Sequence, residues 1–189
     1  MSLLIAGVVL FAAMHLFPAI AEAARDRLAG RLGSGPYRGL FSLLIAGSIA
    51  MIVTGWKSAA PAAVYAPVMS AGATTSLLVL SAFVLFAASI LPTNIRRLLR
   101  NPQLTGVVLW SLAHLLANGD SRSLVLFGGI GLWAIAEILV CNHRDGAWLK
   151  PARTGIRSDA IVVLLGAAVF AAMFYVHVVL FGVPAGPSS

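Results

Sequence analysis

Long apolar runs separated by short basic segments are the feature that most constrains this chain. Of its 189 residues, 60% are hydrophobic and only 10% are charged. A water-soluble domain carries about 25% charged residues, because its surface must be hydrated. The sequence therefore predicts an all-α integral membrane protein, formed by a single domain over residues 1–189.

Six of these runs have, or nearly have, the length that a helix needs to cross a hydrocarbon layer of about 30 Å at 1.5 Å per residue. They predict a bundle of about six transmembrane helices with short loops. The fourth run is the shortest and contains a histidine, so five spans are the alternative. The predicted spans are Leu3–Ala21, Gly39–Trp56, Thr74–Leu91, Gln103–Ala117, Ser123–Cys141 and Ala160–Phe181.

The basic residues between the runs predict the orientation of the bundle. All thirteen Lys and Arg residues lie between spans, and only Lys57 and Arg122 belong to the second and fourth connections. Because basic residues near spans stay in the cytoplasm, we expect the odd-numbered connections to be cytoplasmic and both termini to lie on the other side. The net charge of +7 is thus explained by segments that flank a membrane, and no nucleic-acid partner is expected.

Ionisable side chains inside the spans are the candidate functional residues, because burying such groups in hydrocarbon is costly. His15 lies in the first span and His114 in the fourth. Helical spacing places Trp110 and Gly106 on one stripe with His114, and Ser111 one turn before it. Neutral imidazole binds iron, copper and zinc, and small neighbours let a flat ligand approach. Hydrogen bonding between helices is the alternative role for both histidines.

Two other ionisable residues of the spans are interpreted differently. His177 stands beside Tyr175 near the end of the last span, which is typical of an aromatic belt at the membrane interface. Glu137 lies about one turn from the cytoplasmic end of the fifth span, where snorkelling or pairing with an arginine of the third connection is expected. A closed zinc site needs four N or S ligands, whereas haem needs only one or two axial ligands and an apolar slot. Haem is therefore the favoured cofactor.

The fourth span also contains a recognisable motif. It comprises the run Arg100–Gly106, Trp110, Ala113–His114 and Asn118–Asp120, and a second segment, Gly35–Ser42, follows His15. These residues resemble those of the NnrU family of bacterial membrane proteins. The resemblance covers most of the chain; the motif of the fourth span is fairly specific, and the remainder is mainly hydropathy.

The resemblance implies a cofactor and a cellular setting. NnrU proteins are linked to nitrite and nitric oxide reduction, and their superfamily includes zeta-carotene isomerase, a haem b enzyme that isomerises a cis double bond of a polyene. The implied site is haem b, with its iron between His15 and His114, in the bacterial inner membrane. On the fourth span, helical spacing makes Trp110, Ser111 and Gly106 the expected contacts of the cofactor, because they lie on or beside the stripe of His114.

Three roles stay open at this point. The first is a haem-dependent cis-trans isomerase of a lipid-soluble polyene. The second is an accessory, sensing or electron-delivery protein that supports denitrification together with respiratory-chain proteins. The third is a small-solute transporter without haem. Membrane lipid is a partner in every case.

Two departures from the family pattern bear on this choice. Ser111 stands where the isomerase has a cysteine three residues before the histidine, and Asn101 stands where the family often has a histidine. We therefore expect this chain to share haem binding with the related proteins more readily than isomerase activity. The candidate partners of the haem propionates are cytoplasmic arginines, namely Arg38, Arg96 and Arg97.

Overall fold

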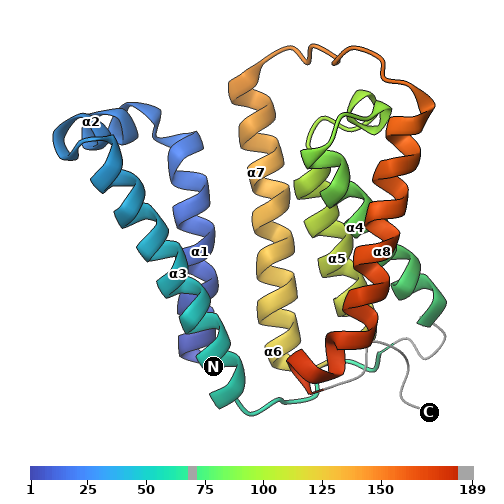
Figure 1. Ribbon diagram of the computed structural model, residues 1–189. Helices are drawn as coiled ribbons and strands as arrows, with labels where there is room; N and C mark the ends of the chain where they lie inside the picture. The colour runs from blue at the N-terminus through green and yellow to red at the C-terminus, as the bar shows by residue number, and fades with distance from the viewer. Residues whose placement is uncertain (68–71, 183–189) are drawn as a thin grey trace. The chain divides into compact units, whose positions relative to one another are not determined.

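The computed structural model describes residues 1–67 and 72–182, and within these ranges the chain is helical, without a strand (Figure 1). This architecture confirms the predicted all-α class. The segments α6, η2 and α7 follow one another without a break and form one continuous helix. The elements are α1 (Ser2–Ile20), α2 (Glu22–Leu32), α3 (Ser34–Ser58), α4 (Gly72–Ile90), η1 (Asn94–Arg97), α5 (Pro102–Ala117), α6 (Ser121–Ser123), η2 (Leu124–Gly128), α7 (Gly129–Asp145) and α8 (Ile156–Phe181).

Five helices are long and apolar enough to cross a membrane: α1, α3, α4, the continuous helix Ser121–Asp145, and α8. They correspond to five of the six predicted spans, so the chain is a multi-pass membrane protein. The remaining predicted span is α5, an apolar helix of 16 residues. At 1.5 Å per residue α5 is about 24 Å long, which is shorter than a typical hydrocarbon layer.

Several helices extend beyond the apolar runs that predicted them. α3 begins at Ser34 rather than Gly39, and α7 ends at Asp145 rather than Cys141. The first connection, which was expected to be a loop, is largely the helix α2. Hydropathy marks only the part of a helix that is soluble in lipid, whereas its backbone hydrogen bonds continue into the polar region.

The helices form two compact units, and each is described by itself. Unit 1 consists of Met1–Ala66 and Gly119–Gly146 and contains α1, α2, α3, α6, η2 and α7. Unit 2 consists of Pro67–Asn118 and Ala147–Ser189 and contains α4, η1, α5 and α8. In unit 1, α1 packs against α3 and α7, and in unit 2, α4 packs against α5 and α8. α1 and α4 are therefore the central helices of their units.

Glycines allow the helices within each unit to approach closely. In unit 1, a Cβ at Gly7 would lie 2.8 Å from a backbone atom of α3, and a Cβ at Gly55 would lie 2.7 Å from the Cα of Leu4. In unit 2, a Cβ at Gly166 would lie 2.6 Å from the Cα of Val84. Contact through small residues is how helices associate in lipid, where the hydrophobic effect does not drive them together.

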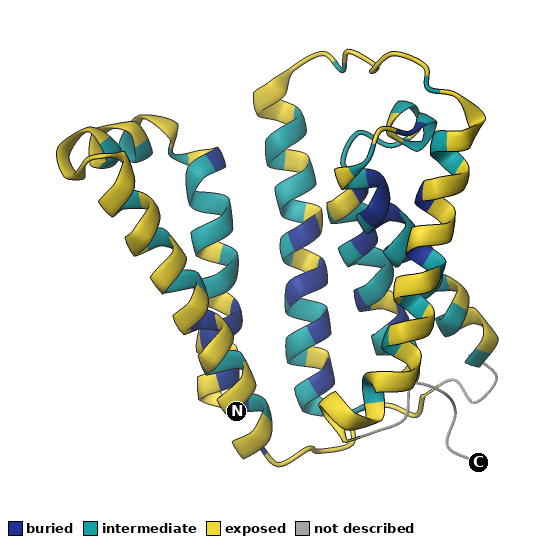
Figure 2. Ribbon diagram, in the orientation of Figure 1, coloured by how far each residue is buried: buried dark blue, intermediate teal, exposed yellow. Residues whose placement is uncertain are grey.

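Large apolar side chains remain exposed along faces of several helices (Figure 2). On α8, for example, Leu164 is 69% exposed and Val179 is 82% exposed. Soluble monomers rarely leave extensive apolar patches in contact with water. These faces are therefore the surface that contacts lipid.

Polar contacts join the end of α3 to the start of α6 in unit 1. Asp120 caps α6 by accepting hydrogen bonds from the backbone of Arg122 and from the backbone and hydroxyl of Ser123. The Nε atom of Arg122 lies 3.6 Å from the Asp120 carboxylate, and its guanidinium lies 4.7 Å from the Trp56 ring centre. Arg122 is one of the two basic residues that depart from the predicted charge bias, and these contacts compensate its charge locally.

The stability of this cap is expected to depend on pH. Burial by itself raises the pKa of Asp120, but hydrogen bonds from Ser123 and the Arg122 backbone, together with the Arg122 charge, hold that pKa below its ordinary value. Such a carboxylate contributes stability above its unfolded pKa of about 4, and the contribution is lost as the pH falls through the folded-state pKa. In detergent, Asp120→Asn should unfold at a lower temperature than wild type at about pH 7, and the difference should shrink towards about pH 3. Parallel curves for the two proteins would contradict this prediction.

Candidate functional site

His15 is positioned by its own helix in unit 1. Its ring nitrogen Nδ1 lies 2.8 Å from the backbone carbonyl of Phe11, one turn earlier on α1. Because a carbonyl can only accept, Nδ1 carries a proton in this arrangement, and Nε2 is the nitrogen that has the lone pair in the corresponding neutral tautomer. Histidines that bind metals commonly donate their second N–H to a backbone carbonyl in this way, which sets the tautomer and the orientation of the ring.

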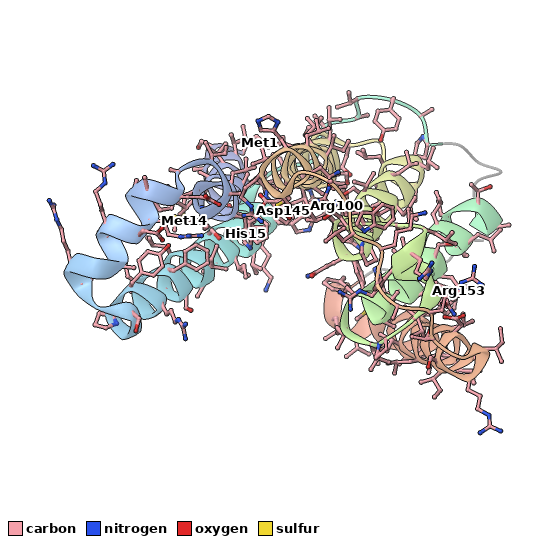
Figure 3. All side chains as sticks on the ribbon, turned by 90° about the horizontal axis from the view of Figure 1, so that it is seen from above. Met1, Met14, His15, Arg100, Asp145 and Arg153 are labelled. Carbon is pink, nitrogen blue, oxygen red and sulfur yellow. The ribbon has the colours of Figure 1, made fainter. Side chains whose placement is uncertain are left out.

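Aromatic rings from three helices surround His15. The ring centre of Phe11 lies 4.1 Å from that of His15, that of Trp133 on α7 lies 5.0 Å away, and that of Phe41 on α3 lies 6.4 Å away. Figure 3 views the molecule from the end at which α1 meets α2 and labels His15 there. The site in unit 1 is thus an imidazole in an apolar, aromatic setting.

Two polar atoms without hydrogen-bond partners lie on α7, next to this aromatic group. Among the described residues, neither Nε1 of Trp133 nor Oε2 of Glu137 forms a hydrogen bond, although both atoms are buried. The other oxygen of Glu137 lies 3.7 Å from the thiol of Cys141, one turn later. Glu137 is two turns from the end of α7 at Asp145, rather than the predicted one, because α7 is longer than its apolar run.

His114 repeats the local geometry of His15 in unit 2. Its Nδ1 lies 2.8 Å from the backbone carbonyl of Trp110, and the two ring centres are 4.7 Å apart. The same tautomer argument makes Nε2 the nitrogen that could coordinate a metal. The amide of Asn118 donates to the His114 carbonyl at 2.9 Å and so closes the end of α5.

The other predicted residues of α5 lie in different surroundings. A Cβ at Gly106 would lie 2.7 Å from the ring of Phe86, so this position is filled by α4 rather than by open space. Ser111 is only 2% exposed, and within the described part of the chain its hydroxyl has no hydrogen-bond partner. Trp110 is therefore the predicted residue of α5 that the structure brings next to His114.

His177 lies near His114 within unit 2. The two imidazoles are within electrostatic range of each other, and the His177 ring centre lies 4.8 Å from that of Phe181. Its position in an aromatic belt stays a prediction. The proximity to His114 was not expected from the sequence, because α5 and α8 are far apart along the chain.

The three arginines predicted as propionate partners are placed differently. Arg38 is exposed on α3, one turn before Phe41, whose ring contacts His15. Arg96 lines a cavity of about 200 Å³ beside Pro102 at the start of α5. Arg97 donates to the Pro151 carbonyl at 2.5 Å. Arg96 and Arg97 thus lie near the opposite end of α5 from His114, and of the three only Arg38 lies on a helix that places a ring beside a candidate ligand.

The two candidate ligands belong to different units, His15 to unit 1 and His114 to unit 2. No cluster of three or more His, Cys, Asp or Glu side chains that could hold a metal ion occurs in residues 1–67 and 72–182. A haem iron needs only one or two axial ligands, so its binding depends on the individual histidines. Sequence reasoning missed Trp133 and Phe41, because only the fold brings α7 and α3 next to α1.

Fold and site together define a multi-pass, all-helical membrane protein that contains histidines in its apolar helices. The family model described as NnrU protein matches residues 3–185, nearly the whole chain. The chain therefore belongs to the NnrU family, as its motif predicted. Comparison with curated proteins and with solved structures gave no match.

Proposed function

We propose that this protein binds haem b, with His15 and His114 as the axial ligands of the iron. The observation that carries the proposal is the shared geometry of the two residues. Each donates its Nδ1–H to the carbonyl four residues earlier, which sets the tautomer that coordinates iron through Nε2. Two histidines on separate apolar helices with the same tautomer are what bis-histidine ligation requires.

The residues around each histidine fit such a group. Phe11, Phe41 and Trp133 would offer aromatic surface to a haem held by His15, and Trp110 would offer it to a haem held by His114. Guanidinium pairs well with carboxylate. Of the three candidate arginines we favour Arg38 as the propionate partner, because it lies one turn before Phe41, whose ring contacts His15. When bound through two histidines, haem b supplies one-electron chemistry.

For the cellular role, we propose electron delivery or sensing in support of nitrite and nitric oxide reduction. Ser111 favours this role over isomerisation of a polyene, because it stands where the isomerase has a cysteine. A serine hydroxyl is a far weaker iron ligand than a thiolate, so a step that depends on the thiol is not open to this chain. Incubation with a poly-cis carotenoid should leave the substrate unchanged, and formation of a trans product would overturn this assignment.

The number of spans and the orientation of the chain in the membrane are also part of the proposal. We propose six spans, with the short helix α5 crossing in a locally thinned or protein-lined region, and both termini on the non-cytoplasmic side of a bacterial inner membrane. The arginine-rich segments before α3, α5 and α8 would then be cytoplasmic. Cysteine labelling at each connection from one side of the membrane tests this arrangement.

Haem binding is tested by the visible spectrum of the purified protein. After expression with added haem, the wild type should show the Soret band of a six-coordinate haem. His15→Ala and His114→Ala should each lose that signature, and haem occupancy should fall at least about tenfold, because one axial bond is removed. His143→Ala, which changes an exposed histidine near the end of α7, is the matched control and should retain the wild-type spectrum.

A fourth variant distinguishes the proposed ligand pair, His15 and His114, from the alternative pair His114 and His177. His177 lies near His114, so His177→Ala should leave the spectrum unchanged if His15 is the second ligand. Loss of the six-coordinate signature in His177→Ala but not in His15→Ala would reject the proposed pair. A wild-type preparation that stays colourless after haem supplementation would reject haem altogether and favour the transporter role.

A further inference from the structure

A second cavity lies in unit 2, where the connection after α4 meets the start of α8. Its volume is about 450 Å³, and its lining is formed by Asn94, Arg97, Leu98, Arg153, Thr154 and Ile156. The two arginines come from different connections, which the chain separates by α5 and the continuous helix Ser121–Asp145. No residue of this cavity is a proposed haem ligand.

Two arginines give the cavity its positive charge. Neither Arg97 nor Arg153 forms an ion pair with a carboxylate in the part of the chain that the structure describes. The nearby carboxylate of Asp159 accepts hydrogen bonds from Thr93 and Asn94. Arg97 is held by its hydrogen bond to the Pro151 carbonyl. An anion that entered the cavity would therefore meet two guanidinium groups without displacing a carboxylate.

A further polar group of the cavity lacks a partner. The hydroxyl oxygen of Thr154 is buried and forms no hydrogen bond among the described residues. Its backbone is fixed by Asn94, whose side chain donates to the Thr154 carbonyl at 2.8 Å and accepts from the Thr154 N–H at 3.1 Å. A buried hydroxyl without a partner is uncommon and calls for a ligand or water. A phosphate oxygen is a suitable acceptor for this hydroxyl.

The rim of the cavity is apolar and exposed. Leu98 is 78% exposed and Ile156 is 81% exposed. Ile156 is the first residue of the apolar helix α8, so the rim lies where the polar connection meets the lipid-facing surface. Figure 3 labels Arg153, one of the two arginines of this cavity. A free anion gains nothing from such a rim, whereas the acyl chains of a lipid would pack against it.

From this combination, we propose that the cavity is a binding site for the phosphate headgroup of an anionic phospholipid. Arg97 and Arg153 bind the phosphate, the Thr154 hydroxyl donates to it, and the acyl chains leave over Leu98 and Ile156. Basic pockets between transmembrane helices are known to recognise such headgroups. The site does not involve haem. In this proposal Arg97 binds the phosphate of a lipid and not a haem propionate.

The test measures lipid binding to the full-length protein in a neutral detergent. Delipidated protein is titrated with phosphatidylglycerol, with phosphatidylcholine and with inorganic phosphate at equal ionic strength, and bound lipid is counted by native mass spectrometry. Phosphatidylglycerol should bind and raise the unfolding temperature, whereas the other two should do neither. Arg153→Gln should weaken the binding about fivefold, and the double variant with Arg97→Gln about 25-fold, because each arginine near a membrane surface contributes a similar attraction.

Arg157→Gln is the matched control, because Arg157 is an exposed arginine on the first turn of α8 that does not line the cavity. It should bind phosphatidylglycerol like the wild type, and Arg153→Lys, which keeps the charge, should retain most of the binding. Equal losses in Arg153→Gln and Arg157→Gln would show general charge attraction and overturn the site. Equal binding of phosphatidylcholine would also overturn it, and tight binding of inorganic phosphate alone would replace the lipid by a free anion. Haem occupancy should not change in Arg153→Gln.

Discussion

Gly55→Ala is expected to destabilise unit 1 by about 3 kcal/mol or more, at the upper end of the range for overpacked helix contacts. The added methyl group would meet the backbone nitrogen of Leu4 and lie 2.7 Å from its Cα. The closest atoms all belong to the backbone of α1, so no flexible side chain at this point could move aside. The two helices would have to separate, and the contacts around Gly7 would be weakened as well.

The matched control for this variant lies on the same helix. A Cβ at Gly47 meets no atom within 4 Å, so Gly47→Ala should leave the stability unchanged or raise it slightly through better helix propensity. Thermal unfolding of both variants in detergent, followed by circular dichroism, measures the difference. If Gly55→Ala unfolds within a degree or two of Gly47→Ala, the close contact of α1 and α3 is wrong.

Asn94→Ala should have a comparable effect in unit 2, of about 3 kcal/mol. The Asn94 side chain donates to the Asp159 carboxylate at 2.8 Å and to the Thr154 carbonyl at 2.8 Å, and it accepts from the Thr154 N–H at 3.1 Å. Three hydrogen bonds would be lost at once, each with a net contribution of about 1 kcal/mol. These bonds attach η1 to the start of α8, so the connection before α8 should also become more sensitive to protease.

Two further variants separate this network from a general loss of polarity. Gln103→Ala removes an exposed amide near the start of α5 and should change the unfolding temperature little. Asn94→Asp keeps the size of the side chain but places a second carboxylate beside Asp159, so it should be at least as harmful as Asn94→Ala. A stable Asn94→Asp would mean that the amide donor is not needed there.

Much of the membrane architecture could be predicted without the fold. A helix must keep its backbone polar groups bonded within itself in lipid, so a long apolar run in a charge-poor chain predicts a spanning helix. Five of the six predicted spans are such helices, and the family motif of the fourth run is matched by the NnrU assignment. The helix ends were less well predicted, because α3 and α7 continue into polar residues where hydropathy carries no signal.

The candidate site could be predicted only in part. The cost of an imidazole in hydrocarbon drew attention to His15 and His114, and helical spacing placed Trp110 beside His114. The same spacing grouped Gly106 with them, but the structure fills that position with Phe86. Spacing along one helix says which residues share a stripe, and it does not say what the neighbouring helix contributes there.

The sequence by itself determined the class of protein, the positions of most of its spans and the two histidines, because these follow from local hydropathy and from helical periodicity. The tertiary structure alone decided which distant residues meet. It placed Trp133 beside His15, joined Asn94 to Asp159, and brought Arg97 and Arg153 to one cavity. Such pairs depend on helix packing between segments far apart in the chain, and that packing is set by small residues and side-chain shape rather than by any local pattern.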